Sequence, residues 1–358
     1  MDYSTRSYII YFGLLIFCFL MAGWADKWNN KRYIFWIALA LSLFSGLRKN
    51  TVGIDTRNYY NMFNSLTSFS SAGNSWNDPY FYKMAYLLMK IKHDPYFVIL
   101  VISIISNFLV VYRLWDYRKF SSYKYAIMRY ISLFYFFSFN CMRQFLAMAI
   151  VFWATKYLEE QDYIKFSLIV IFSAFIHIAS LTALAFIIFD LFKWNSIDKR
   201  SKNFIRLSII FLPVYIAISL NVSSGRQDTY FDSISKLTDY SSLILKIIIF
   251  IAVVIFTIKD HNIFDLTITD RNENLRRNSL LFYIIGLILS SLGYRYNHFE
   301  RIGYFFYIYA TTYLGIAANE KRYKYLFRIV ILFIVIRAFY INCLGDSMGQ
   351  MPYMFKWE

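Results

Sequence analysis

Long apolar segments recur from one end of this 358-residue chain to the other, and they constrain its fold more than any motif does. Many approach the length of about twenty residues that an α-helix needs to cross a bilayer. Hydrophobic residues make up 58% of the sequence, which exceeds the share of about 45–50% that is usual for soluble domains. This pattern predicts an all-α integral membrane protein that forms a single polytopic domain over residues 1–358.

The apolar segments predict a bundle of about twelve transmembrane helices. The expected ranges are 7–24, 32–47, 95–115, 124–139, 142–159, 162–176, 178–193, 203–220, 241–258, 279–293, 302–318 and 323–341. The segments 162–176 and 178–193 meet at "FIHIAS", and one broken helix is an alternative there. The first segment is interpreted as a retained span because no convincing signal-peptide cleavage site follows it.

Basic loops predict the orientation of this bundle in the membrane. Lysine and arginine concentrate near 25–32, 116–124, 194–206, 259–278 and 319–324, which all fall on one side of the predicted spans. Because cytoplasmic loops are enriched in these residues, this side is expected to be cytoplasmic, with both termini outside. The net charge of +16 therefore indicates membrane orientation, and no nucleic-acid partner is expected.

The outer side receives an unusually long polar segment, residues 48–94, which exceeds an ordinary connection. Its second half, "DPYFYKMAYLLMKIKHDPY", alternates apolar and basic residues at helical spacing. It predicts an amphipathic helix on the membrane surface.

Five arginines break the positive-inside pattern and share this outer side. A guanidinium stays charged and binds phosphate oxygens through two parallel hydrogen bonds. A group of arginines at a membrane interface therefore suits a lipid-linked pyrophosphate, although Arg143 and Arg295 have the alternative of extending to lipid head groups. The five are Arg48, Arg57, Arg143, Arg295 and Arg301.

Two further residues on the outer side are candidates for acid–base chemistry. Asp55 lies in "VGIDTR", where it has the alternative roles of helix cap and partner for an arginine. His177 lies between two apolar segments, and an imidazole can exchange a proton near neutral pH. A packed structural histidine is the competing interpretation. His298 and Glu300 are weaker candidates.

Nucleotide-binding, hydrolase and metal-binding motifs are missing from the sequence. The three cysteines are far apart and form no CxxC pair. We therefore expect no cofactor and no metal, with an activated lipid-linked donor as the source of energy.

Several motifs together resemble one family. The stretches "GLRKNTVGIDTRNYY", "MRQFLAMAIVFWATKYL", "FIHIASL", "FERIGYFF" and "MPYMFKW" match the EpsG family in order and spacing over nearly the whole chain. Those proteins are Wzy-like polymerases of bacterial surface polysaccharides. The family usually has threonine where this chain has Ile54, a mild departure.

The resemblance implies a GT-C-like, multispan glycosyltransferase of the bacterial inner membrane with its active site facing outward. Such enzymes pass a growing glycan from undecaprenyl pyrophosphate to a new lipid-linked repeat unit. The implied partners are these lipid-linked oligosaccharides and membrane lipids, and a chain-length regulator protein is a candidate partner.

The resemblance also suggests roles for the residues named above. The five arginines would hold pyrophosphate, with Arg143 stabilising the leaving group. Asp55 or His177 would deprotonate the acceptor hydroxyl, or orient the residue that does. Tyr60 and Gln144 would shape the sugar site.

Three other functions compete with this one. A flippase of lipid-linked sugars would also need cations, but on both sides and usually with internal repeats. A glycan ligase or acyltransferase is the second alternative. A purely structural subunit is the third, and it leaves the grouping of arginines and histidine unexplained.

Overall fold

The structure is a computed structural model of residues 1–358, and it describes residues 3–73, 78–191, 271–292, 297–319, 324–344 and 349–358. Within these ranges the chain is all-α, without a named strand. The α-helices are α1 (Tyr3–Trp28), α2 (Lys31–Gly46), α3 (Thr56–Asn64), α4 (Phe69–Gly73), α5 (Pro79–Ile91), α6 (Pro95–Asp116), α7 (Tyr123–Tyr130), α8 (Phe137–Asn140), α9 (Met142–Glu159), α10 (Tyr163–Ile176), α11 (Ala185–Leu191), α14 (Arg271–Leu292), α15 (Asn297–Tyr307), α16 (Tyr309–Ala317) and α17 (Lys324–Leu344).

Helix starts follow local sequence signals. Asn30 caps α2 by accepting a hydrogen bond from the backbone N–H of Arg32. Asp94 caps α6 by accepting one from the N–H of Tyr96, and Pro95 occupies the first helical turn. Proline suits that position because its missing N–H would have no partner within the helix. The predicted starts at 32 and 95 are therefore confirmed to within a residue.

Three predicted spans are interrupted in the structure. The span 124–139 consists of α7, a π-helical stretch at Ile131–Tyr135 and α8. The span 302–318 begins earlier and is divided into α15 and α16. The alternative of a broken helix at "FIHIAS" describes that region better than two separate spans, because the 3₁₀ segment Ile178–Leu184 follows α10 directly after His177.

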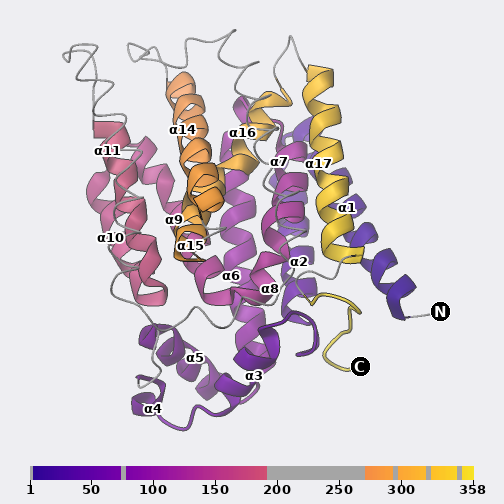
Figure 1. Ribbon diagram of the computed structural model, residues 1–358, viewed down its shortest axis with the longest axis vertical. Coiled ribbons are helices and arrows are strands. Elements are labelled where there is room, and N and C mark those ends of the chain that lie inside the picture. The colour runs from indigo at the N-terminus through magenta and orange to yellow at the C-terminus, as the bar shows by residue number, and fades with distance from the viewer. Residues whose placement is uncertain (1–2, 74–77, 192–270, 293–296, 320–323, 345–348) are drawn as a thin grey trace.

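The long helices run roughly parallel and form one bundle (Figure 1). The pair α2 and α6, the pair α14 and α15, and the pair α9 and α10 make extensive contact. At the α14–α15 crossing, a Cβ on Gly286 would lie 2.3 Å from the backbone nitrogen of Tyr307. Only glycine permits this approach, as at other close helix crossings in membranes.

Two of the described helices are long and apolar enough to cross a membrane by themselves, Ser4–Trp28 and Pro95–Lys119. Shorter apolar helices cover Tyr163–Ile176 and Ile178–Ile188. The count of twelve spans stays a prediction. The expected spans 203–220 and 241–258 lie outside the described residues.

The segment 48–94 forms α3, α4 and α5 at one end of the bundle, where both chain termini also lie (Figure 1). Helix α5 corresponds to the predicted amphipathic helix, whose position on the membrane surface stays a prediction. Its buried side (Phe81, Tyr82, Ala85 and Met89) packs against the protein, where α3, α6 and α10 are neighbours. Its other side exposes Leu87 and Ile91, so the helix has both a protein-facing surface and an outward apolar surface.

Candidate functional site

Arg48 begins the loop between α2 and α3, and it is almost fully enclosed, with 1% of its surface exposed. Its guanidinium donates to the carbonyl oxygens of Ser45, Val52 and Phe139 and to the Thr56 hydroxyl. It also lies 4.5 Å from the centroid of the Phe139 ring. Because these partners occupy its donors, the placement favours a structural role for Arg48 over the expected pyrophosphate contact.

The same loop turns at Gly53, whose φ of 95° lies in the left-handed region. A Cβ at this position would stand 2.6 Å from Thr56 Oγ1 and 3.1 Å from Asn140 Oδ1. Both atoms belong to the hydrogen-bond network around α3. Glycine is therefore required for the backbone angle and for the space.

The C-terminal tail closes over this loop. Lys49 N–H donates to the Met354 carbonyl at 2.8 Å, and Lys356 N–H donates to the Leu47 carbonyl at 2.8 Å. Tyr353 is fully buried beneath them, and its hydroxyl donates to the Phe44 carbonyl at 2.8 Å. The final "MPYMFKW" motif therefore supports the first motif, although more than 290 residues separate them in sequence.

Asp55 precedes α3, and its backbone N–H donates to Asn140 Oδ1 at 3.2 Å. Its carboxylate makes no capping hydrogen bond, and the Asn58 side chain is its hydrogen-bond partner. Burial raises the pKa of the Asp55 carboxyl, while the nearby charge of Arg301, the Asn58 hydrogen bond and the charge of Arg143 act in the opposite direction. Asp55 is therefore a partly buried carboxyl group beside two of the predicted arginines.

Arg143 is the second residue of α9 and contacts the segment 48–94 from across the site. Its Nη1 lies 3.4 Å from Asp78 Oδ2, and its guanidinium lies 5.6 Å from the centroid of the Tyr82 ring. It also shares a hydrogen bond with Tyr59. The Arg143 side chain keeps 24% of its surface exposed, unlike Arg48, so it remains accessible to a ligand.

His177 reaches the same aspartate from α10. Its Nδ1 lies 2.9 Å from Asp78 Oδ2. His177 itself adopts an extended backbone, with φ −155° and ψ 116°, between α10 and the 3₁₀ segment. Asp78 therefore brings together two predicted site residues.

Asp78 is the site residue that the sequence analysis missed. It directly precedes Pro79 at the start of a helix, a pattern that normally indicates an N-cap. In the structure its side chain caps nothing and turns to Arg143 and His177 instead. Only the tertiary arrangement of α5, α9 and α10 reveals this role.

Gln144 and Arg301 are also adjacent. The buried Gln144 amide donates from Nε2 to the Arg301 carbonyl at 2.7 Å. Arg301 is partly exposed in α15, and its charge acts on Asp55 and Cys141. Gln144 thus fixes the backbone of Arg301, an arginine of the site. The Gln144 side chain lies inside the protein and not on an open sugar-binding surface.

The remaining predicted residues lie at the edge of this group or beyond it. Arg57 is exposed on α3. Tyr60 packs against Tyr96, with ring centroids 4.9 Å apart. Arg295 lies outside the described residues. The described ranges contain no group of three or more histidine, cysteine, aspartate or glutamate side chains placed to hold a metal ion.

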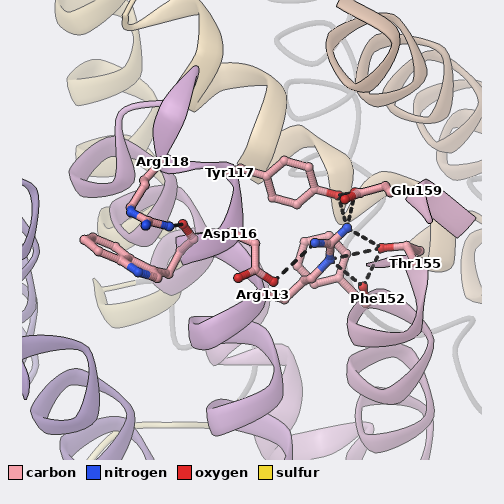
Figure 2. Close-up of polar contacts among 8 residues, drawn as sticks. Arg113, Asp116, Tyr117, Arg118, Phe152, Thr155 and Glu159 are labelled. Carbon is pink, nitrogen blue, oxygen red and sulfur yellow. Dashed lines mark hydrogen bonds and ion pairs between the residues drawn. The ribbon is translucent and has the colours of Figure 1, made fainter. Parts of the chain in front are cut away.

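A second charged cluster lies at the other end of the bundle, between the end of α6 and the end of α9 (Figure 2). Arg113, with 1% of its side chain exposed, pairs with Glu159 and with Asp116. It also donates to the Tyr117 hydroxyl at 2.7 Å and to the Thr155 hydroxyl at 3.1 Å. Because its partners are all supplied by the protein, this cluster fastens helices and leaves no donor for a ligand.

Comparison with protein families identifies a family for this chain. The model of the EpsG family covers residues 31–355, which is nearly the whole chain. Comparison with curated proteins and with solved structures finds no match. The expectation drawn from the motifs is confirmed: this chain belongs to the EpsG family, a family of Wzy-like polysaccharide polymerases.

Proposed function

We propose that this protein joins undecaprenyl-pyrophosphate-linked oligosaccharide repeat units at the outer face of the bacterial inner membrane. The family match supports a polysaccharide polymerase that acts in a membrane. The observation that carries the finer proposal is the gathering of Arg143, Asp55 and Arg301 at the end of the bundle that holds α3 to α5. Arg143 belongs to α9, Arg301 belongs to α15 and Asp55 directly precedes α3. Folding therefore assembles this group of charges from distant parts of the sequence.

The proposed pyrophosphate ligands are four of the five predicted arginines. Arg143 and Arg301 lie at the site, Arg57 lies at its edge, and Arg295 completes the predicted set. Their charges would stabilise the pyrophosphate as it leaves, which is the contribution that preorganised cations make to such reactions. The reaction needs no metal if arginines supply this charge. Arg48 is assigned to the support of the loop, because its donors are engaged by protein oxygens.

The proposed reaction is a direct glycosyl transfer. A hydroxyl of the incoming repeat unit attacks the anomeric carbon of the growing chain, and undecaprenyl pyrophosphate departs. Asp55 and His177 are the candidates for the base that removes the hydroxyl proton. Tyr60 is proposed to contact sugar at the edge of the site, and Gln144 to hold the backbone of α15 in place.

The architecture that we propose is the complete bundle predicted from the sequence. It is a GT-C-like bundle of about twelve spans in a single domain, with α3 to α5 outside the membrane and a chain-length regulator as candidate protein partner. A flippase of lipid-linked oligosaccharides is the alternative function, since it would bind the same anionic headgroup. A glycan ligase would use the same donor with another acceptor.

The test is polymerisation by the purified protein in lipid, supplied with synthetic undecaprenyl-pyrophosphate repeat units. We expect a ladder of products from the wild type and none from Arg143→Ala, with both proteins folded. Movement of the intact lipid-linked units to the opposite leaflet, without a ladder, would replace the polymerase with a flippase. Transfer of glycan only to an added second acceptor would indicate a ligase.

A further inference from the structure

Asp78 occupies a strained position between two helices of the site. Its φ and ψ are 57° and 58°, in the left-handed region. Residues other than glycine rarely adopt this conformation, although aspartate does so more often than most, and residues held in it cluster at functional sites. The side chain is 8% exposed, and its Oδ2 contacts both His177 Nδ1 at 2.9 Å and Arg143 Nη1 at 3.4 Å.

The imidazole of His177 is held from one side only. Its Nε2 is enclosed by the protein and has no hydrogen-bond partner among the described residues. The backbone on either side is fixed, because His177 N–H donates to the Ser173 carbonyl at 3.0 Å and the Ser180 hydroxyl donates to the His177 carbonyl at 2.9 Å. A buried polar atom without a partner is rare in folded proteins and calls for an explanation.

The chemistry of the carboxylate decides which nitrogen carries the proton. An ionised carboxylate can only accept hydrogen bonds. Nδ1 therefore donates to Asp78, and in the neutral ring Nε2 keeps its lone pair. The second contact of the same carboxylate is with Arg143, whose Nη1 lies 3.4 Å from Oδ2 and can only donate.

We infer that Asp78 is a positioning residue that fixes His177 in the Nδ1–H tautomer and thereby makes Nε2 the base of the reaction. This inference rests on the proposed function. The acceptor hydroxyl is the reacting group able to donate to Nε2. Because Nε2 is enclosed in the unliganded protein, binding of the substrate must open a path to it. Asp55 is then an electrostatic neighbour of Arg301 rather than the proton acceptor.

The proposed reaction moves one glycosyl group and one proton. The acceptor oxygen forms a bond to the anomeric carbon, and the bond from that carbon to the pyrophosphate oxygen breaks, with its electron pair leaving on pyrophosphate. The hydroxyl proton passes to His177 Nε2. The resulting imidazolium is stabilised by the Asp78 carboxylate until the ring releases its proton to water.

The tautomer can be measured without any assay of activity. The chain has four histidines, so ¹⁵N-histidine NMR in lipid gives few signals, and the His177→Gln spectrum identifies the one from His177. We expect a protonated Nδ1 and an unprotonated Nε2 in the wild type at the assay pH. In Asp78→Asn we expect the proton to move to Nε2, since the Asn amide can donate to Nδ1. A proton on Nε2 in the wild type would overturn the inference.

Steady-state kinetics of Asp78 and His177 variants provide a second test of the inference. Asp78→Asn is expected to lower kcat by about 10²–10⁴-fold, the usual range for loss of a positioned base, with KM changed less than about threefold. Asp78→Glu should recover part of the rate, and the double variant with His177→Gln should be no slower than His177→Gln alone. Asp94→Asn is the matched control, because it changes a helix-capping aspartate on the same end of the bundle.

The outcomes separate the two proposals. A loss in Asp78→Asn that falls on KM, or that adds fully to the loss in His177→Gln, would overturn the positioning role. A wild type that makes no ladder would reject the proposed function. The NMR result would still report whether Asp78 sets the tautomer.

Discussion

At the scale of single residues, the arginines of the outer end divide into two kinds. Arg48 is enclosed and surrounded by carbonyl oxygens, and burial lowers the pKa of its guanidinium to about 10. Arg143 is partly exposed and faces a carboxylate and two tyrosines. Both are arginines beside apolar segments in the sequence, so residue type and position alone assign them the same role. The difference depends on which donors the folded chain satisfies.

Replacing Arg48 should therefore cost stability before it costs substrate affinity. Arg48→Met removes the donor for several buried oxygens, and each buried polar group left without a partner costs about 1–3 kcal/mol. We expect a large drop in the thermal unfolding midpoint in detergent. Arg57→Met, an exposed change nine residues along the same segment, is the control and should unfold like the wild type. Equal midpoints for all three proteins would contradict the supporting role of Arg48.

Replacement of Asp55, unlike replacement of Arg48, should lower activity without lowering stability. Its pKa is raised in the folded protein, chiefly by burial, so folding favours the protonated form. The penalty for the charged form is absent below the ordinary carboxyl pKa, grows as pH rises to the raised pKa, and is full above it. Asp55→Asn should consequently raise the unfolding temperature at pH 7, but not at pH 3, while it lowers polymerisation because Arg301 loses the carboxylate beside it. A destabilised Asp55→Asn protein at pH 7 would show that the carboxylate is needed for the fold.

At the scale of elements, caps and prolines made several helix boundaries predictable. Asn30 and Asp94 mark the starts of α2 and α6 because their side chains accept from the first turn. The π-helical stretch at Ile131–Tyr135 and the break at Ile308 have no comparable signal, since no proline or glycine lies in the stretch or directly beside the break. The contacts of Asp78 could not be predicted for a related reason. This residue follows the local pattern of a cap, and its actual partners come from two other helices.

The packing of the C-terminal tail on the loop between α2 and α3 could not be predicted from local sequence signals either. It leads to a prediction about the stability of the tail. Tyr353→Ala removes a fully buried aromatic ring, a change that typically costs about 3–5 kcal/mol. We expect the tail to detach and trypsin to cut after Lys49 about ten times faster than in the wild type. Trp357→Ala, which changes an exposed residue of the same tail, should leave the cleavage rate unchanged. An unchanged rate in Tyr353→Ala would show that the tail does not protect the loop.

At the scale of the whole molecule, two clusters of charged side chains lie apart from each other along the bundle. The Arg113 cluster fastens the end of α6 to the end of α9 (Figure 2). Asp78, at the start of α5, contacts Arg143 at the start of α9 and His177 at the end of α10. Helices α3 to α5 lie together at one end of the bundle (Figure 1). Positive-inside reasoning predicted that Arg143 and His177 share the outer side, because orientation depends on the sum of many loop charges rather than on any one contact. It predicted neither Asp78 nor the Arg113 cluster. It did not reveal which arginines are enclosed.

The orientation is itself testable by labelling of single cysteines in intact cells. In a variant with the native cysteines replaced, Ser65→Cys beside α3 should react with a membrane-impermeant maleimide, because it is exposed at the end predicted to face out. Lys119→Cys after α6 should react only once the membrane is opened. The reverse pattern would place the proposed site in the cytoplasm.

The most direct test of the central claim compares two arginines at opposite ends of the bundle in one polymerisation assay. Arg143→Ala changes the candidate site, and Arg118→Ala changes a partly exposed arginine beside the Arg113 cluster (Figure 2). With both proteins folded in lipid and supplied with lipid-linked repeat units, we expect a full ladder from Arg118→Ala and none from Arg143→Ala. A ladder from Arg143→Ala equal to that of the wild type would contradict this expectation.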